Sequence, residues 1–319
     1  MQQQSESQSQ LTGNLLLLLA GLAALGSLAT NIILPAFPEM ARELHTTVKD
    51  LSATLASFFV AFAMGQLFVG PLSDRFGRKW LVMSGLMVFV AGSAMCALAG
   101  SLSQLVVGRI VQAMGVCATS VLSRAIARDL FEGEALARAL SLIMVAMAAA
   151  PGFSPLLGGA LNSVLGWRST FGVVALLAVL LGMRYWSQLG ETHGADKRAA
   201  LSMTAILKTY GELLRDRRFI APALSVSLVI GSLYMFFAMA PAILMAGFGF
   251  APLGLSLFFA STVFVVFGAG ILAPKLARRW GQIRAARAGI LIALTGGIAL
   301  LLGWEDVYYF SFAITVFLL

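Results

Sequence analysis

The sequence has few charged residues and almost no cysteine. Charged side chains make up 11% of its 319 residues, whereas a soluble domain typically carries about 25%. This scarcity excludes an ordinary water-soluble domain. Because Cys96 and Cys117 both lie inside apolar segments, we expect neither a disulfide framework nor a metal site. The ATP-binding pattern G-x-x-x-x-G-K-[ST] is absent, and we predict neither an enzyme nor a cofactor.

Apolar residues, in contrast, make up 59% of the chain. They gather in runs near the roughly 20 residues that a membrane-spanning helix needs. These runs are Asn14–Ala36, Leu51–Leu72, Trp80–Gly100, Leu105–Ala127, Ala139–Leu161, Thr170–Ser187, Phe219–Ala246, Leu253–Leu276, Ala285–Gly303 and a last one that begins at Tyr308. The predicted fold class is an all-α polytopic membrane protein.

The net charge of +8 arises mainly from cations in the turns between spans. We therefore assign them to topology and to membrane lipid headgroups, and we predict no nucleic-acid partner. The turns after the second, fourth, sixth and eighth spans hold most of the lysines and arginines. The opposite turns hold only Arg42, Lys49 and Arg168. Since short cation-rich loops stay in the cytoplasm, we place the N-terminus there, with residues 1–13 as a disordered cytoplasmic tail.

The densest charge cluster follows the second span, in the stretch from Gly70 to Lys79. Asp74 and Arg78 are four residues apart, so they share a helix face and can pair. The pattern G-x-x-x-D-R-x-G-R-K resembles the signature loop between helices 2 and 3 of major facilitator transporters. The resemblance implies a conformational latch that forms in one state and separates in the other. Its residues would be Gly70, Asp74, Arg75, Gly77, Arg78, Lys79 and, from a later helix end, Asp129. The alternative is a plain cytoplasmic anchor.

A long polar stretch suggests that the chain has two halves. We expect an N-terminal six-helix bundle over residues 14–187, a cytoplasmic linker over 188–218 and a C-terminal bundle over 219–319. A weak repeat supports this division, because Gly270, Pro274 and Arg278 repeat the spacing of Gly70, Asp74 and Arg78. The resemblance implies a major facilitator fold with six-plus-six helices. The chain then ends after about nine to ten spans, so we expect a truncated second bundle.

The first span contains Asn31 four residues before Pro35. This stretch resembles the D-x-x-L-P-A-x-P pattern of the Bcr/CflA drug-resistance branch, in which the acid is a candidate proton carrier. Asparagine cannot titrate, so Asn31 can bind a substrate but cannot carry a proton. Glu39 is a possible substitute carrier. Alternatively, Asn31 only forms hydrogen bonds between helices.

The fourth span carries an arginine inside its apolar run, a position that is costly and functional by default. Arg109, Gln112 and Gly115 resemble the R-x-x-Q-x-x-G motif of the same family. The resemblance implies that Arg109 couples protons or binds an anionic group, and we assign Arg109 and Gln112 to the substrate site. The alternative is that Arg109 extends to the outer headgroups.

The fifth span is rich in glycine and proline, which gives a bendable helix with close backbone packing. It resembles the G-P-x-x-G-G motif of the antiporter branch, with a serine in place of the first glycine. The matching residues are Gly152, Ser154, Pro155, Gly158 and Gly159. This motif favours export over uptake.

Methionine and aromatic side chains suit varied apolar ligands. We assign Met144, Met147, Tyr234 and Phe237 to a substrate cavity, although the same residue types also pack between helices or face lipid.

Together these motifs predict a secondary transporter that exports small drug-like molecules of the phenicol or multidrug type. It would work by alternating access in exchange for protons, as a monomer in a bacterial-type inner membrane. Two alternatives remain. The chain is a truncated, non-transporting remnant or sensor, or it is an uptake permease of the same fold.

Overall fold

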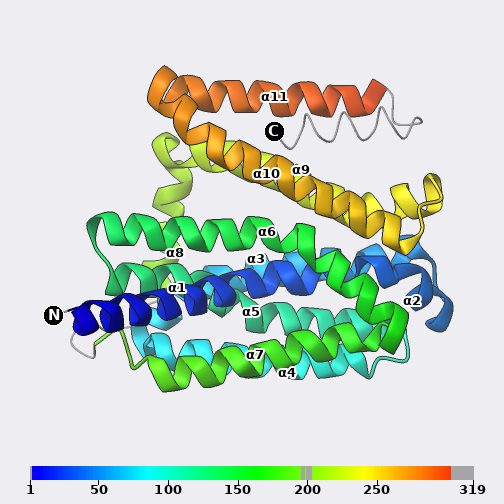
Figure 1. Cartoon of the computed structure of the whole chain (residues 1–319), viewed down its shortest axis with the longest axis horizontal. Coiled ribbons are helices and arrows are strands. Elements are labelled where there is room, and N and C mark those ends of the chain that lie inside the picture. Colours follow the sequence, from blue (N-terminus) through cyan, green and yellow to red (C-terminus); the bar gives the residue numbers. More distant parts are fainter. Residues whose placement is uncertain (1, 195–197, 199–202, 303–319) are drawn as a thin grey trace. The chain divides into compact units, whose positions relative to one another are not determined.

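The computed structural model describes residues 2–194, 198 and 203–302. Every regular element within these residues is helical (Figure 1). The helices are α1 (Gln2–Asn31), η1 (Leu34–Ala36), α2 (Phe37–Glu43), α3 (Val48–Phe76), α4 (Arg78–Ala97), α5 (Leu102–Leu130), α6 (Gly133–Leu165), α7 (Arg168–Gln188), α8 (Met203–Arg215), α9 (Arg217–Ala240), η3 (Pro241–Gly247), α10 (Pro252–Trp280) and α11 (Gln282–Leu302). The chain is therefore an all-α protein, as its composition predicts.

Eight stretches of the described residues are long and apolar enough to cross a membrane. Each of the first six predicted spans falls on one of α1 and α3–α7, and the seventh falls on α9 and η3. The predicted span Leu253–Leu276 falls on α10, which is not one of the eight, because only its part Pro252–Thr262 is given as a shorter apolar helix. The predicted span Ala285–Gly303 falls on α11 as far as Leu302, and the one that begins at Tyr308 lies outside the described residues. The chain is a multi-pass membrane protein.

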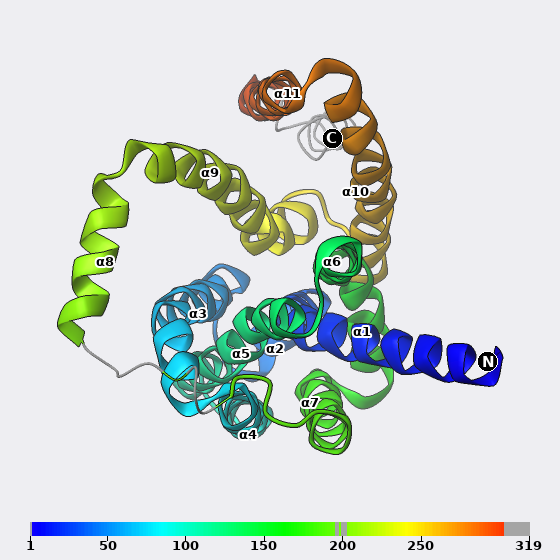
Figure 2. The same ribbon diagram turned by 90° about the vertical axis from the view of Figure 1, so that its left-hand side faces the viewer.

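The chain divides into two compact units, residues 1–206 and 207–319. The boundary falls inside the stretch 188–218 that we expected to be a linker. In the first unit, α5 packs against α1, α3, α4 and α6, and α4 also packs against α7. The end-on view shows this bundle, with the first turns of α1 projecting beyond it (Figure 2). In the second unit, α10 packs against η3 and α11.

Glycine allows α4 and α5 to approach closely. A Cβ atom at Gly115 on α5 would lie 2.6 Å from the carbonyl oxygen of Gly85 on α4. No side chain tolerates that distance, so the two backbones touch directly. Small residues at helix contacts are the usual solution in membranes, where lipid is as apolar as leucine. This close contact holds α5 at the centre of the bundle.

Two features of the helix ends follow from local sequence. Thr47 and Asp50 form a reciprocal capping box at the start of α3, which satisfies backbone donors there. The second feature is the end of α1 at Asn31, which is followed by Pro35 and Pro38, whose nitrogens have no hydrogen to donate to the helix ladder.

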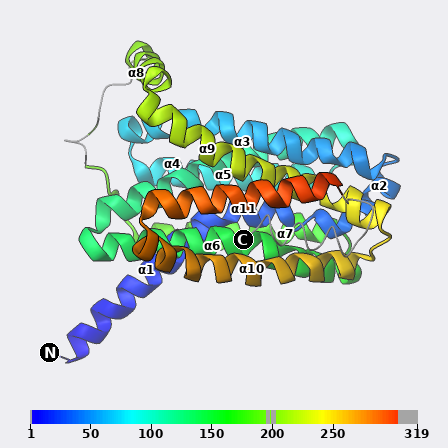
Figure 3. The same ribbon diagram turned by 90° about the horizontal axis from the view of Figure 1, so that it is seen from above.

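The start of α1 differs from our expectation of a disordered tail. The helix begins at Gln2, so residues 2–13 continue it (Figure 3). Residues 2–12 contain neither glycine nor proline. A helix nucleated by the following leucine run can therefore extend back through them.

The weak internal repeat corresponds to a shared turn. Gly77 joins α3 to α4 with φ 94°, and Gly281 joins α10 to α11 with φ 84°. Both are left-handed conformations that favour glycine. Matched on this turn, Asp74 corresponds to Arg278, one helical turn from the register that the spacing suggested. The second turn therefore has a cation where the first has an acid.

Candidate functional site

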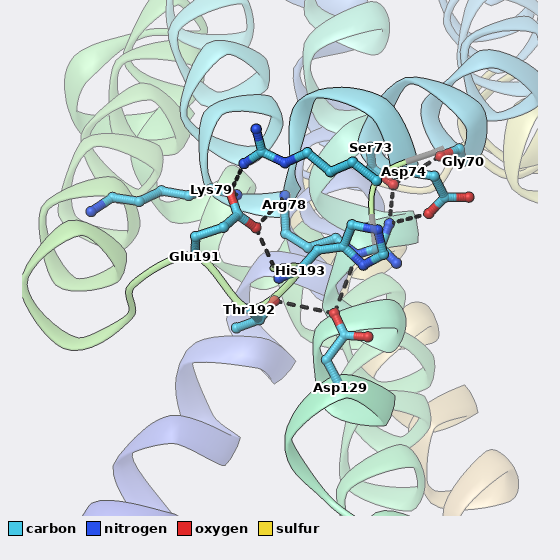
Figure 4. A network of polar contacts seen from close by, with 10 residues as sticks. Gly70, Ser73, Asp74, Arg78, Lys79, Asp129, Glu191, Thr192 and His193 are labelled. Atoms are coloured by element: carbon cyan, nitrogen blue, oxygen red, sulfur yellow. Dashed lines mark hydrogen bonds and ion pairs between the residues drawn. The ribbon is translucent and has the colours of Figure 1, made fainter. Parts of the chain in front are cut away.

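The turn at Gly77 brings the end of α3 next to the start of α4 and directs Arg78 back toward α3. Its guanidinium donates from Nη1 to Asp74 Oδ1 at 2.7 Å and from Nε to Asp129 Oδ2 at 3.2 Å, and Nη1 also donates to the hydroxyl of Ser73. Only 10% of the Arg78 side chain is exposed, against 49% for Asp74 and 22% for Asp129. Figure 4 shows Arg78 between the two acids. The ends of α3, α4 and α5 thus meet at one cation.

The start of α4 is capped by Glu191, which follows α7. Glu191 Oε1 accepts from the backbone N–H of Arg78 at 2.7 Å, and Oε2 accepts from that of Lys79 at 3.2 Å (Figure 4). The capping residue itself, Gly77, offers no side chain, and a Cβ there would collide with the Glu191 carboxylate. A carboxylate at a helix N-terminus is favourable both as an acceptor and through the helix dipole.

The charge of Glu191 is stabilised by these contacts. Partial burial opposes ionisation, but the backbone N–H groups of His193, Arg78 and Lys79, with Arg198 at 4.0 Å, outweigh it and lower the pKa of Glu191 below its ordinary value. The next residue, Thr192, donates its hydroxyl to Asp129 Oδ2 at 3.1 Å. The segment after α7 therefore joins the cluster, which we call the latch cluster: Ser73, Asp74, Arg78, Asp129, Glu191 and Thr192.

The other predicted latch residues take less part in this cluster. The Arg75 side chain is exposed and lies over the Phe76 ring, 5.4 Å from its centroid. Lys79 contributes its backbone N–H, whereas its ammonium lies over Trp186. Gly70 accepts a bond from Ser73 at 2.9 Å. A Cβ at Gly70 would meet nothing within 4 Å among the described atoms, so no close helix approach is seen there.

A second polar site lies inside the bundle around Arg109 on α5. Its side chain is completely buried. Nη1 donates to the Ala29 carbonyl of α1 at 3.1 Å and to Gln112 Oε1 at 2.5 Å, and Gln112 Nε2 donates to Ser93 Oγ of α4 at 2.8 Å. The guanidinium also lies 4.3 Å from the ring centroid of Phe58 on α3. Arg109 thus contacts α1 and α3 directly and is linked to α4 through Gln112, and it does not extend to the headgroups.

Several buried polar atoms on α1 and α5 have no partner in the part of the chain that the structure describes. They are Arg109 Nε and Nη2, and Asn31 Oδ1. Asn31 donates its amide to the Ser27 carbonyl at 2.8 Å, so its acceptor oxygen remains available. Unsatisfied buried donors and acceptors are costly. We call Asn31, Ser93, Arg109 and Gln112 the arginine site.

The glycine–proline motif lies on α6, where this helix packs against α1. A Cβ at Gly158 would overlap the carbonyl oxygen of Ile32. Gly152, Ser154 and Pro155 are also buried, and Gly159 is partly so. Pro151 and Pro155 both lie inside a continuous helix. The motif therefore forms the contact between α6 and the stretch next to Asn31.

The predicted cavity residues are divided between the two units, with Met144 and Met147 on α6 and Tyr234 and Phe237 on α9. Met144 is 57% exposed on α6, and Met147 Sδ lies 3.9 Å from Arg124 Nη1. Tyr234 is half-buried on α9. Phe237 also lies on α9, but its side chain lies outside the described part. Within the residues that the structure places, no group of three or more metal-ligating side chains occurs.

An ion pair that sequence reasoning missed closes the opposite end of the first unit. Glu43 at the end of α2 accepts from Trp167 Nε1 at 2.9 Å and pairs with Arg168. Arg168 also donates to the Ala99 carbonyl at 3.3 Å, next to the turn before α5. Trp167 and Arg168 are neighbours in the sequence, but Glu43 lies 124 residues before Trp167. The sequence therefore does not identify Glu43 as their partner.

The chain matches a family model and is similar to several bacterial proteins. Residues 19–319 match the Major Facilitator Superfamily. An uncharacterized MFS-type transporter, YdgK of Bacillus subtilis, is 36% identical over 76% of this chain and 61% of its own length. A chloramphenicol resistance protein of Pseudomonas aeruginosa is 30% identical over 89% of this chain and 67% of its own. A bicyclomycin resistance protein homolog of Haemophilus influenzae is 26% identical over 93% and 74%.

Among solved structures, the xylose transporter XylE from E. coli in a partially occluded inward-open conformation has a TM-score of 0.72. It is 15% identical over 97% of this chain and 81% of that one. At this identity the likeness concerns the fold alone. The chain spans about 60% of the length of the B. subtilis relative.

Proposed function

The chain belongs to the Major Facilitator Superfamily, related to its Bcr/CflA-type drug-resistance transporters, and from this premise we propose that it exports small drug-like molecules from the cytoplasm. Export would be in exchange for protons, by a monomer in a bacterial-type inner membrane with its N-terminus in the cytoplasm. The observation that carries the proposal is the arginine site, in which a fully buried cation keeps two guanidinium nitrogens without a partner among the residues that the structure describes.

The chemistry of the arginine site suits a compact amphipathic substrate. An arginine at this depth costs at least about 2.5–3.5 kcal/mol, a cost that a purely structural residue would not justify. Arg109 offers N–H donors, Asn31 offers an acceptor oxygen, and Phe58 offers an aromatic face. A molecule with a carbonyl, a hydroxyl and an apolar ring could pair with all three. Phenicol-type drugs have this combination.

Alternating access needs a closure that can open, and the latch cluster has that character. At their ends, it joins α3, α4 and α5 and the segment after α7 through hydrogen bonds and ion pairs. Such contacts can be exchanged for water when the cytoplasmic side opens. The α1–α6 contact at Gly158 would bend in the same step.

Proton coupling requires a group that titrates, and Asn31 does not. The candidate carrier is Glu39, which is half-buried on α2. Arg109 stays charged and would take part by binding the substrate. A carboxylate that binds a proton from one side and releases it to the other would link the proton gradient to export.

The test is uptake of a phenicol and of a cationic dye into inverted vesicles that contain the full 319-residue chain. We expect accumulation that a protonophore abolishes. Arg109→Gln should remove it, whereas Arg128→Gln, an exposed cation on the same helix, should not. Glu39→Gln then asks whether that acid carries the proton.

Two other outcomes favour the alternatives. Accumulation in right-side-out vesicles instead of inverted ones would identify an uptake permease. Saturable binding without accumulation in either orientation would identify a non-transporting sensor or remnant, and no binding at all would overturn the assignment of the arginine site.

A further inference from the structure

An apolar groove lies at the surface of the first unit, between α4 and α7. Its volume is about 650 Å³, and its lining is almost entirely apolar, with Met83, Met87 and Ala91 on one side and Val179, Met183 and Trp186 on the other. The residues on α4 recur at helical spacing, so they form one continuous stripe along the helix. Gly182 forms part of the floor, where a Cβ would lie 3.4 Å from Leu86. Met87, Met183 and Trp186 in its lining are each more than half exposed, so the groove opens at the surface of the first unit.

One end of the groove has a rim formed by a lysine and two tryptophans. The Lys79 ammonium lies 4.0 Å from the ring centroid of Trp186, and Trp80 packs edge-on against the same ring at 6.2 Å. Tryptophan and lysine at a helix end mark the membrane–water interface. Among the ion pairs between described residues, none involves Lys79. The nearby carboxylate of Glu191 is directed to backbone N–H groups instead.

The apolar groove and the cation at its end match the two parts of a phospholipid, its acyl chain and its phosphate. A phospholipid has an acyl chain that would lie along the methionines and a phosphate that would reach the rim. Flexible methionine side chains adapt to a disordered chain better than branched ones do. The rim lies at the end of the unit that the cation distribution assigns to the cytoplasm, where anionic lipids are attracted by lysine and arginine.

We propose that the groove between α4 and α7 is a binding site for an anionic phospholipid, with its acyl chain between the two helices and its phosphate on Lys79 and the Trp186 edge. The site is separate from the arginine site and does not depend on transport. Because Lys79 lies next to Arg78, the lipid would contact the helix end that the latch cluster holds.

The experiment is native mass spectrometry of the purified 319-residue chain, delipidated and then incubated with dioleoyl phosphatidylglycerol or dioleoyl phosphatidylcholine. We expect preferential retention of phosphatidylglycerol. Lys79→Gln should weaken that retention about five-fold, the effect of one interfacial cation. Ala91→Phe, an exposed lining position, should fill the groove and remove the bound lipid of both kinds.

Matched controls separate the site from general lipid adhesion. Ala63→Phe makes the same change at an exposed alanine on α3, away from the groove, and Lys49→Gln removes the same charge at the other end of the first unit. Both should bind as the unchanged chain does. Equal retention of the two lipids, or retention by Ala91→Phe equal to that by Ala63→Phe, would overturn the proposal. A second measure is the quenching of tryptophan fluorescence by brominated phosphatidylglycerol. The contribution of Trp186 is the difference in quenching between the unchanged chain and Trp186→Phe. If the two chains are quenched equally, the proposal is also overturned.

Discussion

At the scale of single residues, Arg78 is the cation on which two acids depend. Removing it leaves Asp74 and Asp129 facing each other's charge without a shared partner. Hydrogen bonds to charged groups contribute about 1.5–3 kcal/mol each, and the half-exposed Asp74 contributes less because water screens it. We expect Arg78→Ala to lower the free energy of unfolding by about 2 kcal/mol, measured by denaturant titration in detergent. Arg75→Ala, three residues earlier and exposed, should change it by less than about 0.5 kcal/mol. Equal losses in the two variants would contradict this role of Arg78.

Glu191 makes the stability of the latch cluster depend on pH. Its folded pKa lies below the ordinary value, so its contribution is complete above the unfolded pKa of about 4.3 and is lost as the pH falls through the folded pKa. We therefore expect Glu191→Gln to unfold at a lower temperature than the unchanged chain at pH 7. The difference should shrink as the pH is lowered below about 4.3. Melting curves from pH 7 to pH 3 test this, and a difference that is constant or grows on acidification would argue against the capping role.

These residues also show what sequence could and could not predict. The Asp74–Arg78 contact follows from a spacing of four on one helix face. The cost of burying Arg109 makes it a functional candidate without any structure. Glu191 and Thr192, in contrast, follow α7 and reach the start of α4 only through the packing of whole helices. In the sequence they belong to a polar stretch that fits a solvated linker equally well. Residue type alone therefore could not identify them as part of the latch cluster.

At the scale of elements, the contact between α1 and α6 depends on the missing side chain of Gly158. A Cβ there would overlap the Ile32 carbonyl, next to Asn31. We expect Gly158→Ala to destabilise the chain by about 1–3 kcal/mol, the usual cost of overpacking. A Cβ at Gly172 on α7 meets no described atom within 4 Å, so Gly172→Ala should be neutral or gain up to about 1 kcal/mol from helix propensity. Thermal unfolding of the two variants separates them, and equal stability would mean that α6 moves away from α1 at little cost.

The elements themselves were largely predictable because hydrocarbon permits few alternatives. Each apolar run of about 20 residues must form a helix that satisfies its own backbone. Glycine and proline then set the ends, as at Gly77 and after Asn31. The first turns of α1 were not predictable in this way, since glutamine and serine fit a coil as well as a helix that is extended from its neighbour.

At the scale of the whole molecule, the two halves share the backbone conformation of one turn but not the charged residues next to it. Gly77 and Gly281 adopt nearly the same backbone conformation, but the acid of the first turn is replaced by Arg278 in the second. The sequence spacing suggested a register one helical turn away, because the glycines alone cannot show which residue lies in the left-handed turn. The first half therefore carries the pairing chemistry of the latch cluster at its turn, and the second half repeats only the backbone conformation.

The cation distribution makes a prediction about how the whole chain lies in the membrane. Ser103, at the start of α5, should face outward, and Ser187, near the end of α7, should face the cytoplasm. Both are exposed, whereas the native Cys96 and Cys117 are buried and should not react. We expect a membrane-impermeant maleimide to label Ser103→Cys in intact cells and Ser187→Cys only after permeabilisation, with the unchanged chain as the unlabelled control. The reverse pattern would place the N-terminus outside, and it would put the latch cluster and the lipid groove's cationic rim on the wrong side for the roles proposed for them.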